Sequence, residues 1–561
     1  MKLRLFGLLL LLPVLMQAQQ IQYSQPEQDD SRRTNFEIIG RVSGNILVFK
    51  NNRSSNAISI YNNDMKLVQR VPLDYLPEKY TNIEFVQYPD FFYMMYEYEK
   101  KNIVHFTAVK LDGQGKRLSD PVDLDTTQVR SFSNTKIYTH VVSEDKQNLM
   151  ILKINSKNPK SYVFTTFLYN NNLELKDRHR INMSVDDRNT AFTSFSLDNS
   201  GQLVFAKYVS NSSGEYVSRV SLITKAAIAD TFSIKDLGVG DRVLDELRIK
   251  IDNPNKRYLI SAFYYKQRRG NIEGLYTVIW DRETDSKVKE SLTVFNDELR
   301  ALAKSSESGI KMAFNDFFIK QLVVKKDGGY LVIGESEYTT SQGNGFNWWD
   351  YMGGSPYLGL MDYYSPFYNP YSPGNRYGMG SNINRYNSEN IMILSFDKNS
   401  NLEWSNVLAK SQYDDDGSSL ISYKMMNTGG ALHFLYNQYE RRTVLLADQS
   451  ISPEGKLTRY PTLRNLDKGY EFMARFGKQI SGNQIVIPCL FRNYLCFAKI
   501  DFENNLAVIG IFKQKATANA LLLFVYALVL KFSILLHPSP PLLHPGDNYL
   551  YRFILTGLNS L

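Results

Sequence analysis

The sequence predicts an all-β fold, a β-propeller built from four-stranded antiparallel blades. Two observations carry this prediction: short turn clusters recur at regular intervals, and runs of strand-like composition flank them. The composition agrees, because the 561 residues include 37 Tyr and 32 Phe, and aromatic residues favour strands. A chain longer than about 300 residues rarely forms one simple core, so this chain must divide into domains or repeat a unit.

A first series of turns recurs eight times along the chain. Gly, Asn and Asp dominate these turns because they tolerate the positive φ that tight hairpins require. The turns lie at residues 43–44, 89–90, 144–145, 198–201, 252–255, 327–329, 427–430 and 481–483. Each turn separates two strand-like runs, which predicts a β-hairpin at each of the eight places.

A second hairpin follows the first in the repeating unit. Its turns include residues 62–64, 112–115, 170–172, 397–401, 453–455 and 503–505. Four antiparallel strands per unit are typical of a propeller blade, and stacking blades around an axis buries faces that one blade cannot hide alone. We therefore predict a propeller over residues 36–512 with eight blades, seven being the alternative. An array of separate β-sandwiches is the competing architecture.

One unit carries a recognisable motif. Residues 391–397 form a strand-like run that ends on Asp397, and Trp404 follows after a short turn. This segment resembles the strand–Asp–turn–Trp motif of quinoprotein-type propellers, which implies that Asp397 caps the turn and that Trp404 docks between blades. The motif occurs in one unit of eight and lacks the Thr-Gly pair of that family, so no cofactor is predicted from it.

The N-terminus has the pattern of a secretory signal peptide over residues 1–18. Lys2 and Arg4 provide the positive charge, residues 5–15 are apolar, and Ala18 is a small residue suited to cleavage. A buried N-terminal helix is the alternative. We predict a flexible segment at residues 19–35 and export to the periplasm, the cell surface or the medium, where nucleic acid is not a partner.

The C-terminal residues 513–561 form an atypical hydrophobic tail. Residues 520–536 are nearly all apolar, a run of about 17 residues at the short limit of a membrane span. Three interpretations remain open: a membrane anchor, a helix that packs on the ring, or a tail unrelated to the fold, such as the product of a shifted reading frame. Membrane contact is predicted only under the first.

Two insertions interrupt the repeat. At residues 296–306, Asn296 or Asp297 can cap a helix, and Leu299, Leu302 and Ala303 fall at helical spacing. The second insertion, residues 339–388, combines aromatic residues with Gly, Pro, Asn and Ser, as binding surfaces do. Its candidate ligand-binding residues are Trp348, Trp349, Tyr351, Tyr357, Tyr363, Tyr364, Tyr368 and Tyr371. A lid packed on the ring or a low-complexity spacer is the alternative.

Acidic residues recur in the connections between units, which the repeat places on one face of the ring. The candidates for a cation site or for acid–base chemistry are Asp186, Asp187, Asp241, Asp245, Asp414, Asp415 and Asp416. Asp is also an ordinary turn residue, and the run at 414–416 lacks the alternating ligands of a calcium loop. No metal site is therefore predicted.

Cys489 and Cys496 are the only cysteines. The residues between them predict a hairpin with Arg492 and Asn493 at the turn, which sets the two cysteines opposite each other at a separation that allows a disulfide. A disulfide and two free buried thiols remain equal alternatives. No histidine pair has the spacing of metal ligands, and no serine-nucleophile motif occurs.

The predicted function is that of an exported, non-enzymatic propeller that binds a protein or a polysaccharide through the aromatic insertion. A glycan-active hydrolase or lyase with acids at the channel face is the alternative, and a structural component tethered by residues 520–536 is a third. The formal net charge of +8 is spread along the sequence, which predicts solubility and weak attraction to anionic surfaces.

Overall fold

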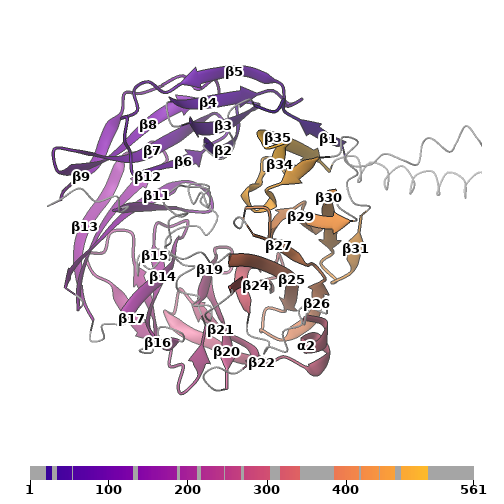
Figure 1. Cartoon of the computed structure of the whole chain (residues 1–561). Helices are drawn as coiled ribbons and strands as arrows, with labels where there is room; N and C mark the ends of the chain where they lie inside the picture. Colours follow the sequence, from indigo (N-terminus) through magenta and orange to yellow (C-terminus); the bar gives the residue numbers. More distant parts are fainter. Residues whose placement is uncertain are drawn as a thin grey trace, which may run out of the picture. The chain divides into compact units, whose positions relative to one another are not determined.

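The computed structural model describes residues 20–27, 34–52, 55–129, 137–158, 160–185, 190–210, 217–245, 247–266, 271–303, 316–341, 384–415, 419–440, 443–460 and 469–502. The chain divides into two compact units, and the unit Gln20–Asp501 holds the β-structure (Figure 1). The predicted signal peptide at 1–18 and the tail at 513–561 lie outside the described residues, so both remain predictions.

The unit is an eight-bladed β-propeller of four-stranded antiparallel blades, which confirms the predicted fold class and excludes separate sandwiches. Strands are given from the innermost outwards. Blade 1 consists of β2 (Thr34–Val42), β3 (Asn45–Asn52), β4 (Ser55–Tyr61) and β5 (Leu67–Pro72), and blade 2 of β6 (Asn82–Gln87), β7 (Phe91–Lys100), β8 (Ile103–Asp112) and β9 (Val122–Gln128). Blade 3 consists of β10 (Tyr138–Val142), β11 (Asn148–Asn158), β12 (Ser161–Asn170) and β13 (Leu175–Ser184), and blade 4 of β14 (Thr190–Leu197), β15 (Leu203–Ser210), β16 (Val217–Lys225) and β17 (Ser233–Asp236).

Blades 5 to 7 follow in the same order around the ring. Blade 5 consists of β19 (Arg248–Asp252), β20 (Arg257–Tyr265), β21 (Ile272–Asp281) and β22 (Ser286–Val294). Blade 6 consists of β23 (Phe317–Val324), β24 (Tyr330–Ser341), β25 (Asn384–Phe396) and β26 (Leu402–Leu408), with β27 (Gln412–Asp414) paired to β25. Blade 7 consists of β28 (Tyr423–Asn427), β29 (Leu432–Glu440), β30 (Thr443–Ile451) and β31 (Leu457–Arg459). A two-residue strand, β18 (Val243–Leu244), pairs with both β16 and β20 and so joins blades 4 and 5.

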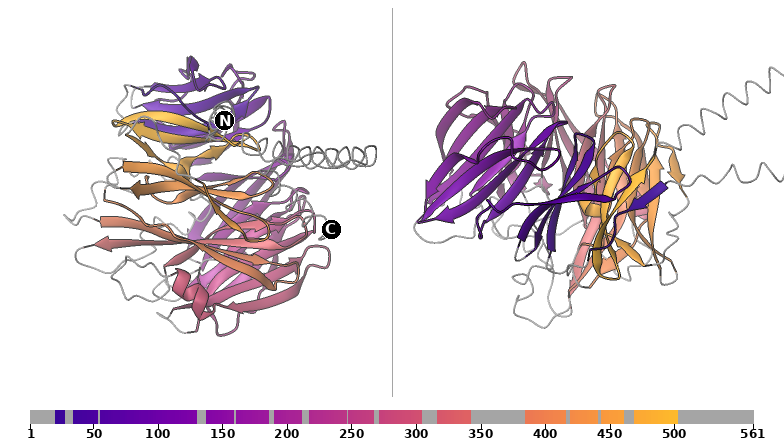
Figure 2. Two further views of the ribbon diagram at one scale, coloured as in Figure 1. Left: turned by 90° about the vertical axis from the view of Figure 1, so that its right-hand side faces the viewer. Right: turned by 90° about the horizontal axis from the view of Figure 1, so that it is seen from above.

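The last blade takes its outer strand from the N-terminus. Its inner strand is split into β32 (Tyr470–Phe472) and β33 (Lys478–Gln479) by the 3-10 turn η3 (Ala474–Phe476). The composition of residues 472–476 is strand-like, so this turn corrects the sequence pattern there. β34 (Gln484–Phe491) and β35 (Tyr494–Asp501) follow, and β1 (Gln20–Tyr23) pairs antiparallel with β35 (Figure 2).

This pairing corrects two expectations. A flexible segment was predicted at residues 19–35, yet residues 20–23 are a paired strand. The outer hairpin of the last blade was predicted around a turn at 503–505, which lies outside the described residues, and the outer position is occupied by β1. The last blade therefore combines both ends of the propeller sequence, which closes the ring.

Residues after β1 attach the N-terminal segment to the first blade. The backbone N–H groups of Ser24 and Glu27 donate to carbonyls of β35 at 2.8 and 2.9 Å. The carboxylate of Glu27 forms ion pairs with Lys50 of β3 and with Arg70 of β5. Tyr61 of β4 donates a hydrogen bond to the same carboxylate at 2.9 Å. Glu27 thus links the closing strand to three strands of blade 1.

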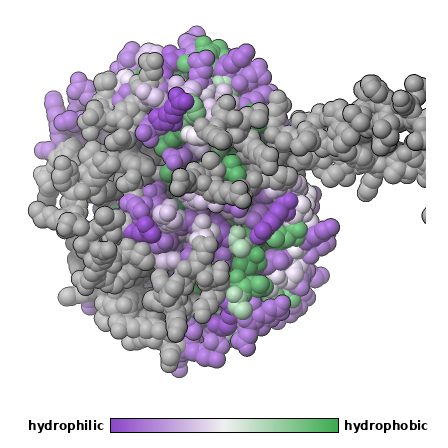
Figure 3. All heavy atoms as spheres, turned by 45° about the vertical axis from the view of Figure 1, so that its right-hand side comes forward, coloured by the Kyte–Doolittle hydropathy of each residue, from purple (hydrophilic) through white to green (hydrophobic). Residues whose placement is uncertain are grey.

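The apolar core lies between neighbouring blades. One cluster joins blades 1 and 2 around Phe49 and Phe85, and another joins blades 8 and 1 around Ile46 and Phe497. Stacked blades bury both sheet faces in this way. The described surface in Figure 3 is accordingly mainly hydrophilic, with apolar atoms in limited areas.

The turns show why Asn and Asp recur in them. The Oδ1 atom of Asp397 accepts hydrogen bonds from the backbone N–H groups of Asn399 and Asn401, both at 2.8 Å. An Asx side chain that holds its own turn in this way favours a tight hairpin. The same pair of bonds, from the second and the fourth residue onward, occurs at the following residues: Asn62, Asp112, Asn170 and Asp198.

Both structural implications of the Asp…Trp motif are confirmed. Asp397 caps its turn, and the indole N–H of Trp404 in blade 6 donates to the carbonyl of Pro453 in blade 7 at 3.1 Å. Gly455 has a φ of +82°, and a Cβ atom there would lie 2.6 Å from Cδ2 of Trp404. The turn of blade 7 thus requires glycine, both for its conformation and to accommodate the indole.

The predicted short helix is present as α2 (Asp297–Ala303). Asn296 caps it, since its Oδ1 accepts the N–H of Leu299 at 2.9 Å. Leu299 and Ala303 are buried, but Leu302 is 57% exposed. The three residues therefore do not form one buried face as their spacing predicted.

Candidate functional site

Residues in or beside the first-hairpin turns of several blades hydrogen-bond to one another at one end of the central channel. The N–H of Asn199 in blade 4 donates to Oδ1 of Asn253 in blade 5 at 3.2 Å. The side-chain amide of Asn253 in turn donates to Glu144 of blade 3 at 2.9 Å. On the opposite side, Gln479 of blade 8 donates to the carbonyl of Asn427 in blade 7 at 2.8 Å. These bonds fix the rim of the channel mouth.

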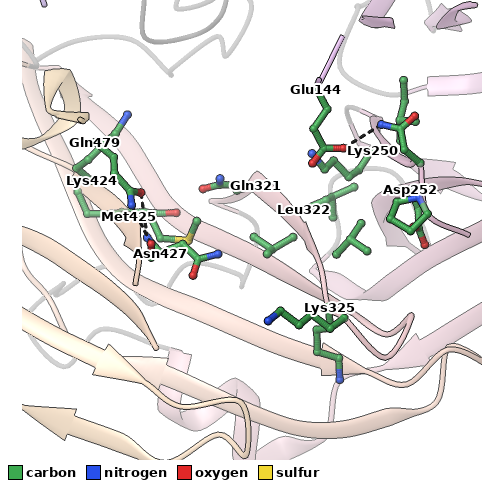
Figure 4. Close-up of a pocket in the computed structure, with 17 residues that line it drawn as sticks. Glu144, Lys250, Asp252, Gln321, Leu322, Lys325, Lys424, Met425, Asn427 and Gln479 are labelled. Atoms are coloured by element: carbon green, nitrogen blue, oxygen red, sulfur yellow. Dashed lines mark hydrogen bonds between the residues drawn. The ribbon is translucent and has the colours of Figure 1, made fainter. Parts of the chain in front are cut away.

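A pocket of about 550 Å³ lies within this rim, and we call it the channel-mouth pocket. Its lining comes from blades 3, 5, 6, 7 and 8, with β23 crossing between the other walls. In Figure 4, Glu144 and Lys250 lie on one side of the opening, Lys424 and Met425 lie on the other, and Gln321 projects between them. Pockets of this size hold small ligands or short chain segments.

The pocket contains four lysines and two acids. Both acids are engaged: Glu144 accepts the Asn253 amide, and Asp252 pairs with Arg257 at 2.7 Å. Among the lysines, Lys325 pairs with Glu403 of β26 at 2.5 Å. The side chains of the acids are therefore already occupied by partners within the fold.

Two of the lysines have no such partner. Lys250 is half-buried and Lys326 is exposed, and the side-chain ammonium of neither makes a hydrogen bond or ion pair with another described residue. Asp252 is neutralised by Arg257, whereas Glu144 keeps its charge because its partner is a neutral amide. The two unpaired ammonium groups outnumber this single charge and give the pocket a positive potential. The even spread of basic residues along the sequence therefore does not hold in space, because the ring gathers Lys250, Lys326 and Lys424 at one mouth.

The predicted aromatic site lies outside the described residues. The eight candidates from Trp348 to Tyr371 fall in residues 342–383, and the structure describes only the strands that bear this segment. β24 and β25 pair as far as Ser341 and Asn384. The segment therefore connects two long paired strands of blade 6, and its binding role remains a prediction.

The predicted acidic residues do not converge in the part of the ring that can be described. Asp186, Asp187 and Asp416 lie outside the described residues. Asp241 is exposed beside the bridging strand β18, and Asp245 accepts a hydrogen bond from Tyr265 at 3.4 Å. Asp414 lies in β27, and Asp415 forms a two-pronged ion pair with Arg385 at 2.7 and 3.0 Å.

Among the described residues, no three side chains of His, Cys, Asp or Glu gather in a way that could hold a metal ion. The described histidines each pair with a carboxylate; His433, for example, lies 3.0 Å from Asp448 in the core. The helices that the structure describes include none with the length and apolarity of a membrane span.

A buried charge network, which the sequence did not reveal, lies in blade 6 and its neighbours. Glu335 of β24 pairs with Lys410 at 2.8 Å, and both side chains are 0% exposed. Next to them, Glu337 pairs with Lys320 at 2.5 Å and with Arg475 of η3 at 3.2 Å. These residues lie up to 155 positions apart in the sequence (320 to 475), so no local pattern could identify the network.

The cysteine register is confirmed. Cys489 lies directly opposite Cys496 in the β34–β35 pair, and Arg492 and Asn493 form the turn with φ of 50° and 68°. The two sulfur atoms are 3.0 Å apart, and both side chains are buried. The choice between a disulfide and two thiols remains a prediction.

We expect the cysteines of reduced protein to resist iodoacetamide while the chain is folded. Burial, aided by the neighbouring Cys496, raises the pKa of Cys489, and the thiolate is the reactive form. Mass spectrometry should find no alkylation before unfolding and two modified cysteines after it. Rapid labelling of the folded chain would contradict this expectation. Unfolding without reductant distinguishes the thiols, which react, from the disulfide, which does not.

Comparisons with known proteins find no relative by sequence and only distant structural similarities. No protein-family model and no curated protein matches the chain. Similar solved structures include a prolyl endopeptidase, with 7% identity and a TM-score of 0.38, and prolyl oligopeptidase B from Galerina marginata, with 8% and 0.39. Each match covers 82% of this chain and 56% of the other, so the chain spans little more than half the length of those proteins.

An ulvan lyase of polysaccharide lyase family PL25 is also similar, with 10% identity and a TM-score of 0.35, over 74% of this chain and 90% of that chain. At such identities and scores, no activity carries over from any of these proteins. The fold itself defines the class, and this chain is an eight-bladed β-propeller protein.

Proposed function

We propose that this chain is an exported propeller that binds a protein or glycan partner without catalysing a reaction, and that the channel-mouth pocket is part of its binding site. The observation that carries the proposal is the pocket itself, a cavity of about 550 Å³ rimmed by hydrogen-bonded turns. A rim fixed before binding lowers the entropy lost on association.

The wall of the pocket combines the groups that a binding site needs. Val323 and Met425 supply apolar surface, Gln321 supplies an exposed amide, and the lysines supply charge. Binding pockets are typically apolar with a few convergent polar groups. The aromatic segment at 342–383 is the second contact region that we propose, on the basis of its composition.

A pocket-filling variant tests the site regardless of which partner binds. We expect Gln321→Trp to fold normally, because Gln321 is exposed, and to lose adhesion to whichever surface the native chain binds in a panel of neutral polysaccharides, acidic polysaccharides and bacterial envelopes. Val288→Trp on β22, where the side chain is 64% exposed, is the matched control and should bind normally. Equal binding by both variants would refute the role of the pocket.

A deletion separates the aromatic segment from the pocket. Replacing residues 342–383 with a short Gly-Ser linker keeps the β24–β25 pairing and retains Ser388, which donates to Glu335 at 2.7 Å. Reduced adhesion would support a contact through the segment, and unchanged adhesion would count against it.

A further inference from the structure

The charges of the channel-mouth pocket specify a ligand class. The ammonium groups of Lys250 and Lys326 have no partner among the described residues, whereas Glu144 accepts the Asn253 amide and Asp252 pairs with Arg257. Lys320 on β23, the strand that leads to Lys326, is by contrast matched by Glu337 at 2.5 Å. The pocket thus has cations left for a ligand.

A second pair of lysines contributes to the same end of the channel. Lys146 lies in the first-hairpin turn of blade 3, and Lys478 begins β33 in blade 8. Burial, and then the nearby charge of Lys478, lowers the pKa of Lys146. Lys146 donates only to the backbone and side-chain oxygens of the neutral Gln87, at 2.7 and 3.3 Å. Like charges held close to one another favour the binding of an anion.

The remaining lining suits a sugar better than a polypeptide. Val323 and Met425 offer apolar surface to the C–H face of a sugar ring, while Gln321 and the lysine ammonium groups can bond to hydroxyls. An acidic saccharide presents an anion, hydroxyls and apolar faces on each ring. These groups match the ammonium groups, the amide and the apolar side chains of the lining. An acidic peptide is the competing occupant, and the Glu-rich probe below tests it.

We propose that the channel-mouth pocket binds an anionic saccharide, with Lys250 and Lys326 holding its carboxylate or sulfate groups. This inference rests on the proposed function and names its ligand class. Carboxylates and sulfates share the chemistry that lysine recognises, a localised negative charge that accepts hydrogen bonds.

The test is titration calorimetry on the full chain with four probes: oligogalacturonate, a heparin-derived oligosaccharide, a neutral malto-oligosaccharide and a Glu-rich peptide. We expect an acidic saccharide to bind and the neutral one not to bind. Affinity should fall as NaCl is raised. The variant Lys250→Gln/Lys326→Gln should bind at least about tenfold more weakly, because each substitution removes a charge-assisted hydrogen bond between lysine and ligand and so lowers the affinity. Lys289→Gln, on the exposed face of β22, is the matched control.

The outcomes separate this inference from the proposed function. If the galacturonate binds, the anion is a carboxylate; if only the heparin fragment binds, it is a sulfate. If the neutral saccharide or the peptide binds best and Gln321→Trp abolishes that binding, the binding function stands and the anionic-saccharide inference is refuted. If an acidic saccharide binds but the Lys250→Gln/Lys326→Gln variant binds it equally well, the inference is also refuted.

Discussion

Deleting residues 20–27 is expected to open the propeller between its last and first blades. The deletion removes β1, so the edge of β35 loses its partner, and it removes Glu27, so Lys50 loses its carboxylate. Tyr23, which stacks on Tyr470 of β32 with centroids 4.2 Å apart, is lost as well. We expect the free energy of unfolding to fall by at least about 3 kcal/mol, the lower range for breaking a buried ion pair, measured by urea unfolding.

A single substitution isolates the ion pair from the strand. Lys50 is 6% exposed and Glu27 11% exposed in their side chains, and burial followed by the charge of Arg70 lowers the pKa of Lys50. Glu27→Gln should therefore be strongly destabilising, by about 3–5 kcal/mol. Glu283→Gln breaks a pair whose side chains are 61% and 65% exposed, and should cost less than about 1 kcal/mol. Equal effects of the two variants would contradict the closure role of Glu27.

Glu335→Leu is expected to be as strongly destabilising as Glu27→Gln. The substitution leaves Lys410 buried without its carboxylate, and the hydroxyls of Ser388 and Ser422 lose an acceptor at 2.7 and 2.5 Å. The expected loss in the free energy of unfolding is about 3–5 kcal/mol. The double variant Glu335→Leu/Lys410→Met should recover most of it, because a buried ion pair replaced by apolar residues of similar size is often neutral. Failure of the double variant to recover stability would show that the wider network, not the pair, is essential.

The same carboxylate makes the folded state sensitive to acid. Burial by itself would raise the pKa of Glu335, but the charges of Lys410 and Lys320, together with hydrogen bonds, outweigh burial and hold the pKa below its ordinary value. A folded-state pKa below the unfolded one contributes stability above pH about 4.3, and this stability is lost as pH falls through the folded pKa. Urea unfolding between neutral and acid pH should therefore show a smaller decline for Glu335→Leu than for the native chain.

The sequence alone determined the features that depend on local chemistry. Asp397 holds a turn through bonds to residues two and four positions onward, so the turns, and with them the eight repeats, can be recognised in the sequence. The same holds for the Cys489–Cys496 register across a two-residue turn and for the Asn296 cap. The exposure of Leu302 was missed, because burial depends on which neighbour covers a helix face.

Only the tertiary structure decided which distant residues meet. Glu27 reaches Lys50 and Arg70, and Glu335 reaches Lys410, through contacts for which the sequence carries no local signal. The lysines of the channel mouth come from different blades. Basic residues that are evenly spread along the sequence therefore come together in the folded ring and give one pocket a positive charge. The physical reason lies in the distance over which each interaction acts. A turn forms from hydrogen bonds among neighbouring residues and so repeats in blade after blade, whereas ring closure and ion pairing depend on how whole blades pack side by side.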